Sequence, residues 1–164
     1  MNKMAATDRR TTSRVERYAW TFFVFVGAVL VLFGLTDLGA GGATFGQGEA
    51  PTFDGITGTS WELIKSSPVA SQIDWMVRAQ AIWMMIAGLL TVFISATAFR
   101  RGERWAWFAM ALWPIAILAL DLNLLLALRH TTQGIPPPLV SGSIFIVLSL
   151  FTLALTFRKA FRPE

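Results

Sequence analysis

Residues 18–38 read YAWTFFVFVGAVLVLFGLTDL and carry no charged side chain before Asp37. A helix rises about 1.5 Å per residue, so about 20 apolar residues cross the hydrocarbon core of a bilayer. The run from Phe22 to Val26 leaves no polar face, which a helix on the surface of a soluble protein requires. The stretch therefore predicts a membrane-spanning helix. It is longer than the about 7–15 apolar residues of a signal peptide, so we expect it to remain uncleaved.

Three further apolar stretches are long enough to span a membrane. They lie at residues 75–99, 105–128 and 138–157. A soluble four-helix bundle is the alternative, but it needs charges that recur on one face of every helix. We therefore expect an all-α bundle of four transmembrane helices. It forms a single membrane domain over residues 1–164, with one outer loop over residues 39–74.

The composition excludes several classes of protein. Hydrophobic residues make up 54% of the chain and charged residues 15%, against about 45–50% and about 25% in soluble domains. The chain has no cysteine, which excludes disulfides, thiolate metal sites and a cysteine nucleophile. His130, the single histidine, is the one candidate ligand for haem or chlorophyll, but it lies at the edge of the third stretch. The sequence therefore predicts no catalytic residues and no metal site, and it identifies no cofactor.

The basic residues predict the orientation in the membrane. Eleven of the 14 Lys and Arg residues flank the stretches on one side: Lys3, Arg9, Arg10, Arg14, Arg17, Arg100, Arg101, Arg104, Arg158, Lys159 and Arg162. Lys65, Arg78 and Arg129 lie on or near the other side. Because cytoplasmic segments are rich in Lys and Arg, we expect a multi-pass protein with both termini in the cytoplasm. The charges form no stripe with stacking aromatics, so the net charge of +4 does not indicate a nucleic-acid partner.

The outer loop carries turn and capping signals. Its first part, residues 39–48, is rich in glycine, and Asp54-Gly55 is a turn signal. Ser71 and Asp74 have the spacing of a capping box and predict the start of the second spanning helix.

A second capping box lies within this loop. Thr59 as N-cap and Glu62 at the third helical position predict a short helix over residues 61–66. We expect Trp61, Leu63 and Ile64 of this helix to lie at the headgroup boundary, where tryptophan is common. Capping and turn roles explain most of the carboxylates in the loop without a catalytic pair.

Polar residues gather in the outer halves of the apolar stretches: Asp37, Arg78, Gln80, Asp121 and Asn123. Asp121 lies about seven residues, or ~10 Å, below the outer end of the third stretch. An unpaired carboxylate at this depth is costly, so we expect it to face the bundle, pair with a cation or be protonated. Three roles stay open for these residues: an ion pair of Arg78 with Asp121 or Asp37 that joins helices, the lining of a small ligand pocket, or a station on a proton or ion path. The inner halves contain no carboxylate, Lys or His to continue such a path.

Small residues predict close helix contacts. Ala87, Thr91 and Ser95 recur every four residues in the second stretch, and Gly27 and Gly34 lie seven apart in the first. Small side chains let membrane helices approach closely. These faces suit contacts within the bundle or with another membrane subunit.

Two segments carry a resemblance to known proteins. They are residues 51–62, PTFDGITGTSWE, and residues 99–107, FRRGERWAW, the latter followed by Pro114. With them the chain resembles small uncharacterised four-helix bacterial integral membrane proteins. The resemblance implies a four-helix fold in a bacterial inner (plasma) membrane, and it implies no activity or catalytic residue.

These features favour a non-enzymatic membrane protein. We expect an accessory or scaffolding subunit of a larger membrane complex, such as an energy-transducing one, with the lipid bilayer and other membrane subunits as its partners. The alternative is a binding protein or small transporter. It would take a lipid, quinone or other small amphiphile in a polar pocket around Asp37, Arg78 and Asp121.

Overall fold

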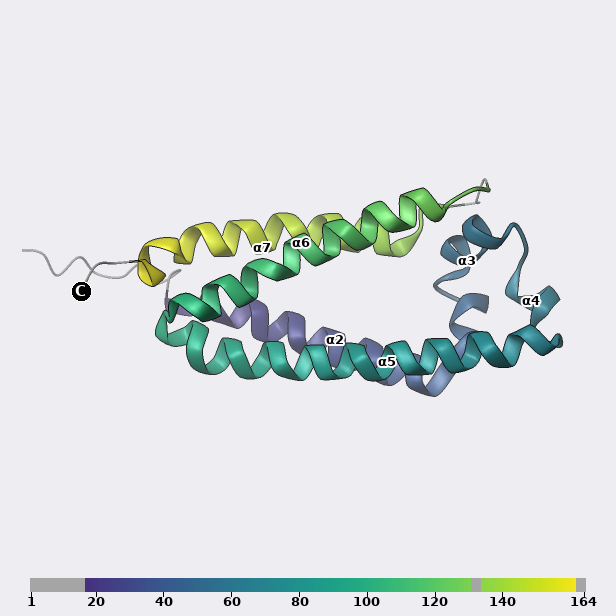
Figure 1. Ribbon diagram of the computed structural model, residues 1–164, viewed down its shortest axis with the longest axis horizontal. Coiled ribbons are helices and arrows are strands. Elements are labelled where there is room, and N and C mark those ends of the chain that lie inside the picture. The colour runs from purple at the N-terminus through teal and green to yellow at the C-terminus, as the bar shows by residue number, and fades with distance from the viewer. Residues whose placement is uncertain (1–16, 131–133, 162–164) are drawn as a thin grey trace, which may run out of the picture.

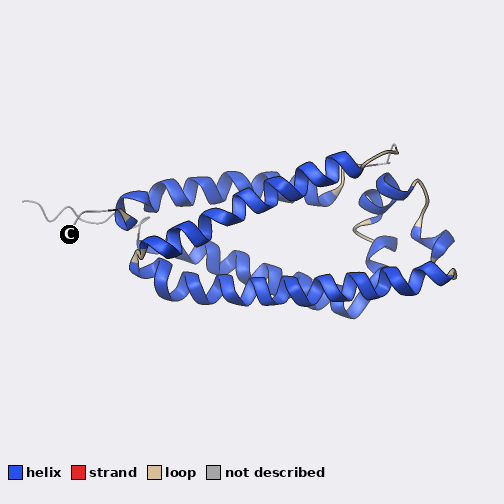
Figure 2. Cartoon of the chain, viewed as in Figure 1, coloured by secondary structure: helices blue, strands red, loops and turns tan. Residues whose placement is uncertain are grey.

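The computed structural model describes residues 17–130 and 134–161, and these residues form helices and no strand (Figure 2). Four helices are long and apolar enough to cross a membrane: α2 (Trp20–Ala40), α5 (Pro68–Ile94), α6 (Arg104–Ala127) and α7 (Pro137–Ala160). A turn of π-helix, η2 (Ser95–Phe99), continues α5. The predicted all-α fold with four long apolar helices is confirmed, although α5 begins well before the predicted residue 75.

The four long helices form two antiparallel pairs, α2 with α5 and α6 with α7 (Figure 1). Glycines bring α2 and α5 into close contact. A Cβ on Gly27 would lie 2.6 Å from the carbonyl oxygen of Gly88, and one on Gly34 would lie 2.8 Å from that of Ala81. Packing of this kind holds helices together in lipid, where the hydrophobic effect does not drive their association. The close-approach role predicted for Gly27 and Gly34 is confirmed.

The two pairs meet at the end of the bundle where α2 begins and α7 ends (Figure 1). A buried core there takes one large side chain from each chain segment: Phe23 of α2, Phe99 of η2, Met110 of α6 and Leu153 of α7. The indole Nε1 of Trp107 adds a hydrogen bond to the carbonyl oxygen of Leu153 at 3.1 Å. The four long helices, with α5 represented by its continuation η2, therefore share one packed core at this end.

Basic residues surround the same end, which we call the basic end: Arg17, Arg100, Arg101, Arg104, Arg158 and Lys159. The guanidinium of Arg100 lies 5.1 Å from the ring centroid of Trp20. Gly102 follows η2 with a φ of +83°, a conformation that glycine adopts readily where a helix ends. The remaining basic residues of the predicted cytoplasmic side, Lys3, Arg9, Arg10, Arg14 and Arg162, lie outside the described residues.

Short helices cover the opposite end of α5. They are η1 (Gly41–Gly46), α3 (Ala50–Thr57) and α4 (Trp61–Ile64), and we call them together the cap (Figure 1). A second small core of Phe45, Phe53, Trp61 and Ala70 holds the cap on the first turn of α5. The predicted outer loop is therefore mostly helical, with more helices than the single one predicted.

Two predictions for this segment are wrong. Asp54 and Gly55 lie within α3 instead of forming a turn, because Pro51 begins the helix and Gly58, with a φ of +71°, ends it. Trp61 does not lie on an outer surface: it is 8% exposed and packs on Gly42.

The predicted capping box is also displaced. The residue before α4 is Ser60 rather than Thr59, and it makes no side-chain cap bond. At α5 the helix begins after Ser67, so Ser71 lies inside the helix instead of capping it.

The cap also contacts the far end of α6. The backbone N–H groups of Arg129 and His130 donate to the carbonyl oxygen of Gly55, at 2.9 Å and 3.1 Å. The ring of His130 lies against Gly58, where a Cβ would be 3.0 Å from its Nε2. These contacts connect the two helix pairs at the end far from the basic end.

Candidate binding cavity

The structure separates the polar residues that the sequence groups together. Arg78 pairs with Asp74, one turn earlier on α5, with 2.8 Å between Nε and Oδ2. Arg78 also donates to the carbonyl oxygen of Leu38 near the end of α2. Arg78 therefore does join two helices, but it does so through Asp74 and a backbone carbonyl rather than through Asp37 or Asp121.

Asp74 is the member of this ion pair that sequence reasoning missed. Its Oδ1 also accepts a hydrogen bond from the backbone N–H of Gly42 at 2.9 Å. Gly41 has a φ of +55°, and a Cβ there would lie 1.9 Å from the same oxygen, so this position requires glycine. The spacing of Ser71 and Asp74 suggests a capping box. The four-residue spacing of Asp74 and Arg78 is the signal that identifies the pair, since it puts opposite charges on one helix face.

Within residues 17–130 and 134–161, the side chains of the other predicted residues make no hydrogen bond or ion pair with Arg78 or Asp74. Asp37 is half-buried near the end of α2, where its backbone carbonyl oxygen accepts a hydrogen bond from the N–H of Gly41, while the hydroxyl of Thr44 donates to the carbonyl oxygen of Gly41. Gln80 and Asn123 are exposed on the surface of the bundle. The structure therefore does not bring the five residues into one site.

Asp121 lies on α6 and faces α7. A Cβ built on Gly142 of α7 would lie 2.5 Å from Oδ2 and 2.6 Å from Oδ1 of Asp121, so the carboxylate packs against bare helix backbone. Among residues 17–130 and 134–161, Asp121 makes no hydrogen bond and no ion pair. An ionisable group within a membrane helix is costly, and it is therefore a candidate for function.

A cavity of about 280 Å³ opens beside Asp121, between α2 on one side and α6 and α7 on the other. Asp121 and Ser141 supply polar groups, and the remaining wall is largely apolar. The other lining residues are Phe25, Val26, Val29, Leu30, Phe33, Trp113, Ile117, Leu120, Pro138, Gly142 and Phe145. Phe25, Phe33 and Leu120 line the cavity and are also 66%, 56% and 64% exposed, so the cavity is open sideways to the surroundings of the bundle.

Trp113 separates this cavity from a groove on the other side of α6. Its Nε1 donates to the hydroxyl of Thr91 on α5 at 3.0 Å, which links the two helix pairs. Its ring stands edge-on to Phe145, with 6.4 Å between the centroids. The groove behind it, about 350 Å³ between α5 and α6, is lined by small and apolar residues such as Ala109 and Ala116.

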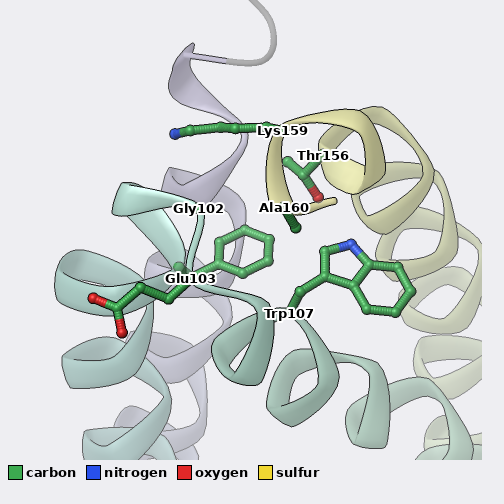
Figure 3. Close-up of a pocket in the computed structure, with 7 residues that line it drawn as sticks. Gly102, Glu103, Trp107, Thr156, Lys159 and Ala160 are labelled. Carbon is green, nitrogen blue, oxygen red and sulfur yellow. The ribbon is translucent and has the colours of Figure 1, made fainter. Parts of the chain in front are cut away.

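A small pocket lies at the basic end. Phe99, Trp107 and Thr156 enclose a space of about 10 Å³ there, which is room for about one water molecule. Figure 3 shows that Lys159 and Glu103 extend away from this space. The pocket is too small for an organic ligand. The groove between α5 and α6 is larger, but no ionisable residue is among its lining residues, so the cavity at Asp121 is the candidate site.

The groups on the cavity wall define its chemistry. The carboxylate of Asp121 accepts hydrogen bonds. The hydroxyl of Ser141 lies within 3.0 Å and 3.3 Å of the carbonyl oxygens of Pro137 and Pro138, to which it donates. No cluster of three His, Cys, Asp or Glu residues suited to a metal ion occurs within the described ranges. His130, the candidate pigment ligand, is not among the lining residues.

No family model matches this chain, and no curated protein or solved structure is significantly similar to it. A function is therefore inferred from the residues and the geometry of the chain itself.

Proposed function

We propose that this protein binds one amphiphilic molecule in the cavity beside Asp121, as a multi-pass protein of a bacterial inner membrane. The observation that carries the proposal is a sideways-open cavity with largely apolar walls and one carboxylate that has no partner among the described residues. Ligand sites are commonly mostly apolar, with a few polar groups that orient the ligand. The volume of about 280 Å³ is close to the lower end of the about 300–1,000 Å³ of such sites.

The sideways opening suits a ligand that arrives through the lipid. Phe25 and Phe33 of α2 form part of the rim and are exposed on the face that membrane lipid would cover. A hydrophobic molecule dissolved in the bilayer can reach the cavity there without crossing a polar surface. Asp121 would then hold its polar head.

The proposed orientation has both termini in the cytoplasm. The described basic residues of the basic end support it, because Lys and Arg are enriched in cytoplasmic segments. In this orientation the cap and the cavity belong to the outer half of the membrane. Fusion of a reporter enzyme to either terminus tests the orientation, and activity specific to the periplasm contradicts it.

Co-purification tests the binding function. Protein extracted in mild detergent is analysed by native mass spectrometry, and we expect one bound lipophilic molecule per chain. Ile117→Phe fills part of the cavity and should remove the adduct. Leu118→Phe adds the same ring on the neighbouring, 49% exposed residue outside the lining, and should retain it. Identical adducts in the wild type and in Ile117→Phe contradict the proposal.

An accessory role in a larger membrane complex is the second candidate. The groove between α5 and α6 favours it, because the small side chains of Ala109 and Ala116 leave room for a helix of another subunit to approach closely. The same purification distinguishes the two functions. A stoichiometric protein partner that is lost in Ala116→Leu supports the accessory role, and a single bundle with a bound small molecule supports ligand binding.

A further inference from the structure

We propose that the cavity selects amphiphiles with a cationic, hydrogen-bond-donating head group, such as an alkyl or arylalkyl ammonium. This inference rests on the proposed binding function and adds the chemical class of the ligand. The head group would donate to the carboxylate of Asp121, and the apolar tail would lie between α2 and α6.

The polar groups on the cavity wall favour a donor in the ligand. Asp121 has no partner within the described residues, so its oxygens are available to accept hydrogen bonds. Ser141 already donates its hydroxyl to a backbone carbonyl of the preceding turn. Trp113 already donates its indole N–H to Thr91. The wall therefore offers acceptors to a ligand, while its side-chain donors are engaged.

The part of the wall formed by the described residues also contains no positive charge. None of the lining residues is Lys or Arg. Arg78, the cation that the sequence offers as a partner for Asp121, is held by Asp74 and by the carbonyl oxygen of Leu38. A carboxylate or phosphate head group would therefore meet the charge of Asp121 without a compensating cation, whereas an ammonium would neutralise it.

The shape of the site fixes the direction of the ligand. Gly142 leaves space for the Asp121 carboxylate against the α7 backbone, so the carboxylate stays at the edge of the cavity rather than filling it. Trp113 lies eight residues earlier on α6, which is about 12 Å along the helix axis. Its ring and that of Phe145 form an edge-on pair at the other end of the lining, where an aryl or alkyl tail would pack.

Three ligands that share one tail test this selectivity: phenylhexylamine, phenylhexanol and phenylhexanoate. Their binding at neutral pH is measured by equilibrium dialysis against the full chain in nanodiscs of zwitterionic phosphatidylcholine, with empty nanodiscs as the control for partition into lipid. A charge-assisted hydrogen bond is worth about tenfold or more in affinity. We expect the amine to bind at least about tenfold more tightly than the alcohol, and the carboxylate most weakly.

Variants assign the preference to Asp121. Asp121→Asn keeps the shape and should reduce the affinity for the amine about tenfold, while binding of the alcohol stays within about twofold. The double variant Asp121→Asn, Asn123→Asp moves the carboxylate to an exposed position outside the lining and should not restore the preference. Unchanged binding of the alcohol to each variant shows that the cavity is intact.

The outcomes separate the two proposals. If none of the three ligands binds saturably, both the binding function and the head-group preference are wrong. If all three bind equally, or the carboxylate binds best, the cavity binds amphiphiles and the preference for cations is wrong. If the amine preference persists in Asp121→Asn, the preference does not arise from Asp121 and this inference is overturned.

Discussion

The two ends of the bundle differ in how the helix pairs meet. At the basic end, one core is filled by four large side chains from α2, η2, α6 and α7, namely Phe23, Phe99, Met110 and Leu153. Toward the cap, α2 faces α6 and α7 across a cavity of about 280 Å³. The difference is not a lack of large side chains, because Phe33 and several other large residues line the cavity. Packing at one end lets the bundle keep its fold while space remains open at the other.

Truncation of one large side chain at each end should give the largest difference in the free energy of unfolding. Phe23 is fully buried and stands edge-on to Phe99 with 5.3 Å between the ring centroids, whereas Phe33 is 56% exposed on the same helix. We expect Phe23→Ala to lower the free energy of unfolding by about 2 kcal/mol or more through loss of packing. Phe33→Ala should change it by less than about 0.5 kcal/mol, since lipid replaces the lost contacts.

Unfolding in denaturant, with the protein in mixed micelles, measures both changes. Each variant is compared with the wild type at the same detergent-to-protein ratio. Equal destabilisation by the two truncations would mean that the helices around the cavity are packed as firmly as those at the basic end. The proposed difference in packing between the two ends would then be wrong.

A smaller loss of stability is expected from a substitution at the contact between the cap and α5. Gly41→Ala puts a methyl group at a φ of +55° and 1.9 Å from Oδ1 of Asp74. The backbone of Gly41, with a φ of +55° and a ψ of −136°, lies in a region that residues other than glycine rarely adopt, and this conformation alone costs them about 1 kcal/mol or more. The bond from the N–H of Gly42 to Asp74 should therefore weaken and the cap should open more often.

Limited proteolysis measures this opening, and cleavage within residues 41–64 should become faster. Gly48→Ala is the matched control, because nothing lies within 4 Å of a Cβ there and its φ is not in the left-handed range. In both variants, α2 and α5 should remain protected from proteolytic cleavage. Equal cleavage rates for wild type and Gly41→Ala would indicate that the cap does not depend on this contact.

Much of the fold could be predicted because it depends on local properties of the sequence. The length of residues 18–38 and the absence of charge before Asp37 are sufficient to predict a spanning helix. The close contacts at Gly27 and Gly34 follow from side-chain size alone. The helix over residues 50–57 was missed because burial of Phe53 in the cap outweighs the turn preference of Asp54-Gly55.

The site was less predictable because it depends on distances between helices. Asp37 and Asp121 on other helices were the expected partners of Arg78, but the ion pair forms with Asp74 on the same helix, four residues earlier. The depth of Asp121 in α6 was evident from the sequence, but its contact with Gly142 was not. The cavity arises because the α6–α7 pair diverges from α2, and no local pattern encodes that divergence.

The smallest expected effect concerns the two exposed polar residues of the predicted cluster. Gln80 and Asn123 lie on the surface of the bundle, and neither lines the cavity. Replacing each by Leu removes a polar group without disturbing a packed contact, so the free energy of unfolding should change by less than about 0.5 kcal/mol. Phenylhexylamine binding should stay within about twofold of the wild type, in contrast to the loss of about tenfold expected for Asp121→Asn. A loss of binding in Gln80→Leu or Asn123→Leu would extend the site beyond the cavity, to a surface of the bundle where the structure gives these residues no common neighbour.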